Sequence, residues 1–309
     1  MKPKVSTDNF QRRIIEAIKN NYKISVGKLR RIPVGEESES FKVTSGEGKR
    51  YFVKYSAKKD VIHHLATANK LLIELHQLGI NYLVPPISID NITEFDFEKG
   101  KIYIYPFVEG VVLTCTNLEL PKNIITQLTS ILADLYKISN RITTPLPTEK
   151  YSCNYTERFE DLKKERNAAS NKLLKNNEGK ITTMLKQFDS LATKFKDAKI
   201  KNIVTHGDVT GLNIIQTESG IVLTDWDGTM LAPKERDLNF LKGNKHFSPD
   251  DYLNKSGADT YNEKLVCYYD LKWSLGSILG RMEHLLKLDL TEKQTKETEQ
   301  KTLEYLSYY

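Results

Sequence analysis

The chain has 309 residues, of which 28% are charged, 39% are hydrophobic and 9% are aromatic. This composition excludes a long disordered chain, a collagenous repeat and a low-complexity tract. At this length a single hydrophobic core usually gives way to two lobes, so we predict one soluble, enzyme-sized globular unit with a cleft. The formal charge of +6 is spread along the chain without a cluster of Arg and aromatic residues, which argues against nucleic-acid binding.

The N-terminus and the cysteines bear on the compartment. Residues Met1 to Lys4 are followed by polar residues rather than by the apolar segment of a signal peptide, and no stretch approaches the roughly 18 apolar residues of a membrane span. We therefore expect a cytoplasmic protein without a membrane partner. Cys115, Cys153 and Cys267 lack metal-site and disulfide spacing, so they are expected to be buried thiols. The oligomeric state is left open by the sequence.

The first third of the chain is predicted to combine an antiparallel meander with two helices. Phe10, Ile14 and Ile18 have helical spacing, and this helix should end near Asn20 and Asn21. Strands are predicted over 28–34, 40–44, 50–55, 84–89 and 101–107, with turn-rich residues at 35–37 and 45–48. A second helix is predicted over about 66–78, where Gly79 would end it.

Beyond Pro106 the periodicity changes from strand to helix. We place the lobe boundary at 107–111, which gives an N-terminal lobe of residues 1–108 and a C-terminal lobe of residues 109–309. Helices are predicted over 123–138, 156–199 and 262–288, with short strands at 201–205, 213–216 and 220–225. The charged stretch 156–199 has its apolar side at Leu173, Leu174, Met184, Leu185 and Phe188.

Two short segments carry the chemistry: His206 to Asn213, with the sequence HGDVTGLN, and Ile221 to Asp227, with the sequence IVLTDWD. Phosphoryl transfer from a nucleotide needs a carboxylate that accepts the proton of the substrate hydroxyl, and oxygen ligands for Mg²⁺. Asp208 and Asn213 have the interval of the H-x-D-x-x-x-x-N pattern, in which the Asp is the base and the Asn is a metal ligand. Asp225 follows an apolar strand one hairpin later, where a second metal carboxylate is expected.

Each of these features alone is more often an ordinary turn or cap residue. Together with Lys54, which ends the strand-like sequence YFVK, they indicate phosphoryl transfer. At these residues the sequence resembles the aminoglycoside phosphotransferase family, the antibiotic and small-molecule kinases built on the protein-kinase fold. The stretch Asp225 to Leu238, DWDGTMLAPKERDL, is most similar to the spectinomycin phosphotransferase branch, as is the helical insertion around 156–199.

The resemblance covers nearly the whole chain and implies both the fold and the site. The fold would be α+β and bilobal, with a small antiparallel N-terminal lobe and a larger, mainly helical C-terminal lobe. Asp208 is the expected catalytic base, Asn213 and Asp225 are the expected Mg²⁺ ligands, and Lys54 would contact the α- and β-phosphates. ATP or GTP is the expected co-substrate.

The nucleotide contacts implied by the resemblance come from two further segments. The backbone of the interlobe segment would receive the adenine through Tyr105, Pro106, Phe107 and Val108. In the loop 34–41, Ser38 and Ser40 are candidates for binding phosphate, against the alternative of an ordinary polar hairpin.

The sequence departs from the family pattern in the partner of the lysine. The family's lysine is held by a Glu near the start of the following helix, which corresponds to about Ala66, whereas the only carboxylate of the predicted helix is Glu74. Asp60 or a shifted register would have to substitute, or the pair is absent. Asp227 is left open between a metal ligand, a contact to a cationic substrate and the cap of the next turn.

Several other polar and aromatic residues are expected to be structural. His206 should brace the catalytic loop through hydrogen bonds, because the kinase mechanism assigns the proton to the Asp. Trp226 should fill the core beneath the metal loop. The remaining structural expectations are a buried ion pair between Arg236 and Asp237, and two surface residues without metal, His63 and His64.

We therefore expect transfer of the γ-phosphoryl group of ATP or GTP to a hydroxyl of a small, cationic acceptor. Asp208, Asp225 and Asp227 would attract an aminocyclitol such as spectinomycin, and the Lys-rich stretch 163–201 gives no sign of the acidic pocket that larger aminoglycosides need. One alternative is a kinase of another small hydroxylated metabolite or of a macrolide. A second is a kinase-like nucleotide-binding protein with little turnover, and a third, suggested by the pI of about 8.9, is a nucleic-acid-binding protein.

Overall fold

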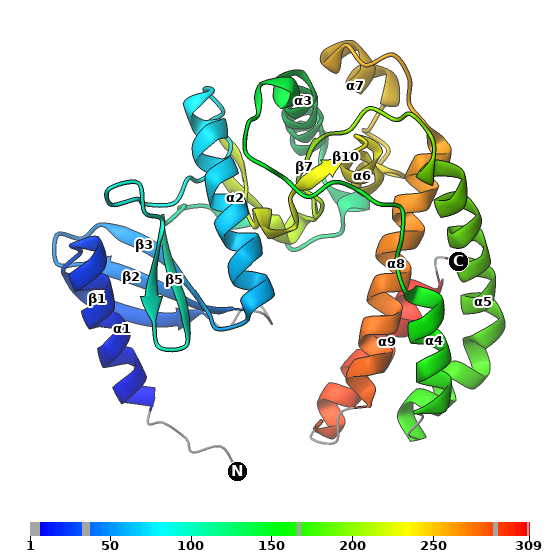
Figure 1. Ribbon diagram of the computed structural model, residues 1–309, viewed down its shortest axis with the longest axis horizontal. Helices are drawn as coiled ribbons and strands as arrows, with labels where there is room; N and C mark the ends of the chain where they lie inside the picture. Colours follow the sequence, from blue (N-terminus) through cyan, green and yellow to red (C-terminus); the bar gives the residue numbers. More distant parts are fainter. Residues whose placement is uncertain (1–6, 33–37, 166–167, 287–289, 308) are drawn as a thin grey trace. The chain divides into compact units, whose positions relative to one another are not determined.

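The computed structural model describes residues 7–32, 38–165, 168–286, 290–307 and 309 of the chain (Figure 1). Its contacts divide the chain into two compact units. The first unit comprises residues 1–147, 203–231 and 241–258, and the second comprises residues 148–202, 232–240 and 259–309. The expected division after residue 108, into a nucleotide-binding lobe and a lobe with the acceptor pocket, stays a prediction.

A five-stranded antiparallel sheet in the order β1-β2-β3-β5-β4 forms the N-terminal part of the first unit (Figure 1). The strands are β1 (Val26–Ile32), β2 (Glu39–Ser45), β3 (Arg50–Ser56), β4 (Glu94–Phe97) and β5 (Gly100–Pro106). One face packs on Ile14 and Ile18 of α1 (Thr7–Tyr22), which confirms the first predicted helix. Val53 belongs to this core, so the alternation of side chains along β3 puts Lys54 on the opposite face.

The strand predicted over 84–89 is wrong. Pro85 and Pro86 have no N–H to donate to a ladder, and the described chain there is a loop that touches β5 through one bond, from Ile87 N–H to the Ile104 carbonyl at 2.8 Å. The strand that pairs with β5 on that side is β4, which the sequence analysis did not identify.

Helix α2 (Lys59–Gln77) begins about seven residues before the predicted start. Val61 and Leu65 are buried and continue the apolar stripe of Leu72 and Leu75 toward the N-terminus, which explains the extension. The helix covers the Lys54 face of the sheet, where Val61 and Leu65 pack on Tyr103.

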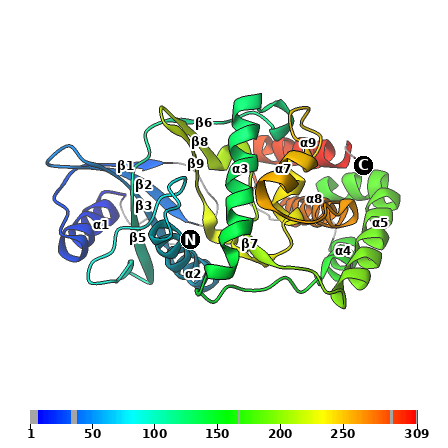
Figure 2. The ribbon, with the colours of Figure 1, turned by 90° about the horizontal axis from the view of Figure 1, so that it is seen from above.

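The remainder of the first unit combines helices with short strands. α3 (Lys122–Ile138) packs on α7 (Pro249–Ser256), a short helix that was not predicted (Figure 2). The short strands form the sheets β6-β8-β9 and β10-β7 and are β6 (Val111–Val112), β7 (Ile203–Thr205), β8 (Ile214–Thr217), β9 (Gly220–Leu223) and β10 (Met230–Ala232). The predicted helix 123–138 and the three predicted short strands are thus confirmed, with β7 and β9 shorter than expected and β8 shifted by one residue.

The second unit is helical. Its helices are α4 (Tyr155–Lys164), α5 (Ala168–Lys196), α6 (Glu235–Leu238), α8 (Glu263–Leu285) and α9 (Glu292–Ser307). The apolar side predicted for 156–199 is confirmed, because all five of its named residues are buried in one core cluster with α8. α9 was not predicted, since Thr302 and Leu306 are its only buried residues and its sequence is otherwise polar.

The antiparallel N-terminal sheet and the helical C-terminal part confirm the α+β class. The described helices include none that is long and apolar enough to cross a membrane. Cys115 is exposed and the other two cysteines are partly buried, so the thiols are free but the prediction that they are buried is wrong. His63 and His64 are exposed on α2, as expected. Asp237 is buried, and its ion pair with Arg236 stays a prediction.

Candidate active site

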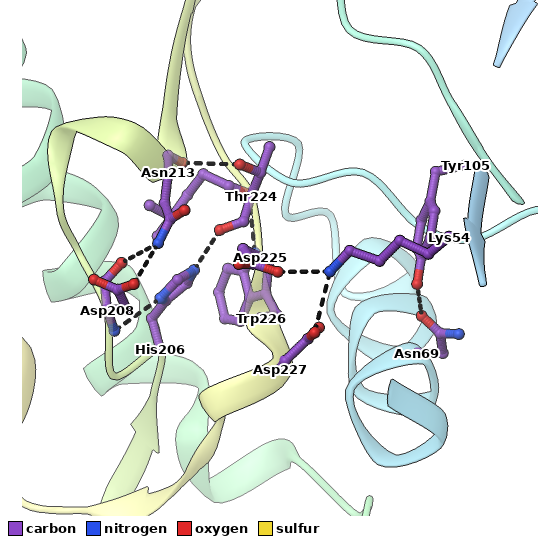
Figure 3. Close-up of polar contacts among 11 residues, drawn as sticks. Lys54, Asn69, Tyr105, His206, Asp208, Asn213, Thr224, Asp225, Trp226 and Asp227 are labelled. Atoms are coloured by element: carbon purple, nitrogen blue, oxygen red, sulfur yellow. Dashed lines mark hydrogen bonds and ion pairs between the residues drawn. The ribbon is translucent and has the colours of Figure 1, made fainter. Parts of the chain in front are cut away.

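The loop that carries Asp208 begins where β7 ends, at His206, which is buried (Figure 3). The Asp208 N–H donates to His206 Nδ1 at 3.2 Å, so Nδ1 carries no proton and Nε2 donates to the Thr224 carbonyl at 2.8 Å. The imidazole also packs edge-on against Trp226, with ring centroids 4.8 Å apart. His206 therefore ties the loop of Asp208 to the hairpin that leads to Asp225, which confirms the bracing role predicted for it.

Asp208 and Asn213 are joined directly. Asn213 Nδ2 donates to the Asp208 carboxylate at 2.8 Å and to the Asp208 carbonyl at 2.9 Å (Figure 3). The 3-10 turn Gly211–Asn213 closes the loop, and the Asn213 carbonyl accepts the Thr224 N–H at 2.9 Å. The two motifs found in the sequence thus form one hydrogen-bonded structure.

Asp225 has a left-handed backbone with φ of 63°, which costs a non-glycine residue roughly 1–2 kcal/mol. The following turn is anchored by Trp226, which is buried and donates through Nε1 to the Leu223 carbonyl at 2.9 Å, as the expected core position requires. This backbone leaves the Asp225 side chain 48% exposed, whereas Trp226 points inward.

Lys54 contacts both carboxylates of the DWD sequence (Figure 3). Its Nζ lies 2.6 Å from Asp225 Oδ1 and 3.1 Å from Asp227 Oδ2. Burial lowers the pKa of Lys54, but the charges of Asp227 and Asp225 outweigh it and hold that pKa above its ordinary value. For Asp225 the effects are reversed. Burial raises the pKa of Asp225, but the positive charge of Lys54 outweighs burial and holds the pKa of Asp225 below its ordinary value.

Helix α2 supplies no carboxylate to this lysine. Glu74 accepts four hydrogen bonds of 2.6–2.9 Å from the N–H groups and hydroxyls of Thr143 and Thr144, and Asp60 is exposed in the first turn. The buried polar residue of α2 is Asn69, whose Oδ1 accepts the Tyr105 hydroxyl at 2.8 Å. The partners of Lys54 are Asp227 and Asp225 rather than Asp60, the substitute suggested by the sequence. The signal was present in the DWD sequence, but Asp227 was left open between other roles.

The remaining nucleotide candidates lie on the same sheet. Ser40 is buried on β2 directly opposite Lys54 in the register, and Ser38 lies in the bend before that strand. Gly35 to Glu37, with Pro33 and Val34, fall outside the described residues. A contact of either serine with phosphate stays a prediction.

The segment after β5 has a distinct pattern of backbone hydrogen bonds. The Phe107 N–H donates to the Arg50 carbonyl at 3.1 Å. Because every second residue of an antiparallel strand bonds to the same neighbour, the backbone N–H and C=O of Tyr105 also face β3. Pro106 has no N–H. The Pro106 carbonyl therefore points away from β3.

The donor set suits Mg²⁺. Asp225 and Asn213 offer a carboxylate and an amide oxygen, the hard ligands that this ion takes, and it usually needs only one or two carboxylates beside phosphate oxygens and water. Within the described part of the chain, no group of three His, Cys, Asp or Glu side chains could hold a metal ion.

The comparisons with known proteins agree with this geometry. The phosphotransferase enzyme family (APH) matches residues 28–251, more than two thirds of the chain and all the site residues named above. No curated protein sequence gives a significant match. Spectinomycin phosphotransferase, APH(9)-Ia, solved in complex with ADP and spectinomycin, has a TM-score of 0.76 at 21% identity over 96% of this chain and 93% of that chain.

Two other solved structures share the same fold. The amicoumacin kinase hAmiN, in complex with AMP-PNP, Ca²⁺ and Ami, has a TM-score of 0.67 at 12% identity, covering 96% of this chain and 93% of that one. The GDP and kanamycin complex of APH(2")-IIia has a TM-score of 0.63 at 11% identity, covering 97% and 99%. The expected kinase-like fold is thereby confirmed.

Proposed function

The chain belongs to the phosphotransferase enzyme family, and from that premise we propose that it transfers the γ-phosphoryl group of ATP to a hydroxyl of spectinomycin or a closely related aminocyclitol. The observation that carries this proposal is the junction of the two motifs, in which Asn213 contacts Asp208 and Lys54 contacts Asp225. Such an enzyme would confer spectinomycin resistance on the cell.

In this reaction the oxygen of the acceptor hydroxyl bonds to the γ-phosphorus, and Asp208 accepts the proton of that hydroxyl. The bond between that phosphorus and the β–γ bridging oxygen breaks, and ADP leaves with the electron pair. Asn213 and Asp225 would hold Mg²⁺, which neutralises phosphate charge when it is bound. The 2.8 Å bond from Asn213 supports the base role, because it fixes the rotamer of the Asp208 carboxylate.

Lys54 binds the α- and β-phosphates, and Asp227 is its permanent carboxylate partner. Asp225 would also hold the Mg²⁺, so its carboxylate would be shared between two cations. Asp227 lies 3.1 Å from Lys54 Nζ and is free of that demand. We thus assign Asp227 to the lysine rather than to the acceptor, and Ser38 and Ser40 to the phosphates.

The backbone after β5 favours ATP over GTP. The Pro106 carbonyl accepts the amino group of adenine, while the Val108 N–H donates to the neighbouring ring nitrogen. Guanine carries a carbonyl oxygen in place of that amino group and would set two acceptors against each other at Pro106. Tyr105 and Phe107 contribute side-chain surface, since their N–H groups face β3.

Spectinomycin is the preferred acceptor on two grounds. The sequence from Asp225 to Leu238 resembles the spectinomycin branch, and the solved enzyme of that branch binds spectinomycin. The carboxylates of Asp208, Asp225 and Asp227 are balanced by Lys54 and by the Mg²⁺ that Asp225 would hold, so the phosphates of ATP leave the loaded site negative, which favours a cationic acceptor. The kinase-like protein without turnover loses its motivation, because Lys54 does have carboxylate partners.

Purified protein with Mg²⁺ and either ATP or GTP tests the proposal on a panel of spectinomycin, kanamycin, a macrolide, methylthioribose, homoserine and choline. We expect ADP release and a phosphorylated product by mass spectrometry with spectinomycin first, and a higher kcat/KM with ATP than with GTP. Phosphorylation of another panel member, with spectinomycin unmodified, would refute the acceptor assignment and leave phosphoryl transfer intact.

A further inference from the structure

A single side-chain amide outside both motifs holds the middle of the catalytic loop. Asn117 begins the 3-10 turn η1 (Asn117–Glu119), and its Nδ2 donates to the Val209 carbonyl at 2.6 Å. The Gly211 N–H donates in turn to Asn117 Oδ1 at 2.9 Å. Val209 follows the proposed base directly, and Gly211 opens the turn that ends at Asn213. One amide therefore fixes the loop between the base and the metal ligand.

A second amide holds the turn that carries Asn117. Asn244 is 4% exposed, and its Nδ2 lies within hydrogen-bond distance of the carbonyls of Asn117, Leu118 and Leu120, at 2.7, 3.3 and 3.0 Å. Its Oδ1 accepts the His246 N–H at 2.8 Å, which fixes the orientation of the amide. Asn117 is thus anchored from a segment 127 residues away in the sequence.

The apolar packing of the turn falls on its C-cap, Leu120, which is 1% exposed. None of the residues of η1 itself is buried, and Leu118 is 51% exposed. The loop is seated closely, since a Cβ added at Gly211 would lie 2.7 Å from the Leu113 carbonyl oxygen and 2.8 Å from that of Cys115. A glycine at this position and an amide on its N–H together determine where the loop can lie.

We infer that Asn117 is a positioning residue for phosphoryl transfer, which sets the distance between Asp208 and Asn213 and is itself held by Asn244. The inference rests on the proposed function. Catalysis by positioned groups is sensitive to small displacements, and a shift of about 1 Å can cost roughly 10²-fold in rate. Losing this amide would allow the loop such a shift without unfolding the unit.

The test compares Asn117→Ala, which removes both bonds, with Asn117→Asp, which keeps the acceptor for Gly211 N–H and loses the donor to Val209. Glu119→Gln is the matched control, because Glu119 accepts from Thr116 at the exposed cap of the same turn and does not touch the loop. We expect Asn117→Ala to lower kcat for spectinomycin about 10²-fold with an acceptor KM within about twofold of the native value. Glu119→Gln should keep the native kcat.

Two measurements do not depend on the acceptor. Hydrogen exchange at the Gly211 amide should become fast in Asn117→Ala and stay slow in Asn117→Asp and Glu119→Gln. The Mg²⁺ concentration that half-saturates ADP binding, measured by calorimetry, should rise in Asn117→Ala. Native Gly211 protection or a native Mg²⁺ requirement in Asn117→Ala overturns the inference, as does native kcat in that variant. An unmodified protein that phosphorylates no panel member instead contradicts the proposed function.

Discussion

Replacing Asp227 by Asn tests the partner of Lys54 with almost no change of shape. The substitution keeps an oxygen near Lys54 Nζ, now 3.1 Å from Asp227 Oδ2, but removes the negative charge. When Asp225 holds Mg²⁺, Asp227 is the carboxylate that remains for the lysine. Asp227→Asn should therefore weaken the productive placement of ATP rather than of the acceptor.

The expected size follows from the distance. Two unit charges 3.1 Å apart attract by about 5 kcal/mol at an effective dielectric constant of ~20, which is a ceiling because both side chains keep some solvent. The net value of a hydrogen bond to a charged group is about 1.5–3 kcal/mol. At roughly 1.4 kcal/mol per factor of ten, kcat/KM for ATP should fall about 10- to 10²-fold.

The assay varies ATP at saturating Mg²⁺ and spectinomycin, and then varies spectinomycin at saturating ATP. Asp250→Asn is the control for net charge, because Asp250 is exposed in the first turn of α7. Native kcat/KM for ATP in Asp227→Asn would refute the pairing. A loss confined to the KM of spectinomycin would place Asp227 against the acceptor instead.

Three further outcomes are expected. Asp208→Asn should keep the fold and nucleotide affinity while lowering turnover at least ~10²-fold, and unchanged turnover would remove Asp208 from the mechanism. Asn213→Ala should raise the Mg²⁺ concentration needed for half-maximal activity, and a native Mg²⁺ response would exclude it as a ligand. Burial raises the pKa of Glu74, but the bonds from Thr144 and Thr143 outweigh it and lower that pKa to about 2. The pKa of Glu74 in the folded protein lies below the ordinary value of 4.5. The ionised Glu74 carboxylate therefore stabilises the protein above pH 4.5, and this stabilisation is lost as the pH falls toward 2. The thermal midpoint of Glu74→Gln should thus lie below the native one at pH 7 and converge with it in acid. Equal midpoints at pH 7 would show that the hydrogen bonds from Thr143 and Thr144 to the Glu74 carboxylate do not stabilise the protein.

The arrangement of the two motifs was predictable because most of it is local in sequence. Asp208 and Asn213 are five residues apart and contact each other within one loop, so their spacing alone reports their geometry. The hairpin that delivers Asp225 is also local, since β8 and β9 pair between Ile214 and Leu223, and its apolar strand is visible as a run of hydrophobic residues. Periodicity also identified the apolar side of α5, since burial in a helix repeats every three to four residues.

The partner of Lys54 was not predictable in the same way. Asp225 and Asp227 lie 171 and 173 residues after Lys54, whereas the family pattern pointed to the helix that follows the lysine. Val61 and Leu65 extend the apolar stripe of α2, but two exposed histidines and a threonine between its apolar residues obscured the period. At 84–89 the apolar residues suggested a strand, but the two prolines there lack the N–H groups that a β-ladder needs.

The residues that support the catalytic loop from behind are the hardest to find by sequence. Asn117 lies 92 residues before its Val209 partner, and Asn244 lies 127 residues after Asn117. Asparagine is common in turns for purely local reasons, so nothing distinguishes these two from ordinary loop residues until the fold brings them together. A motif therefore reports the groups that touch the reacting atoms, whereas the precision of their placement depends on contacts that only the folded chain creates.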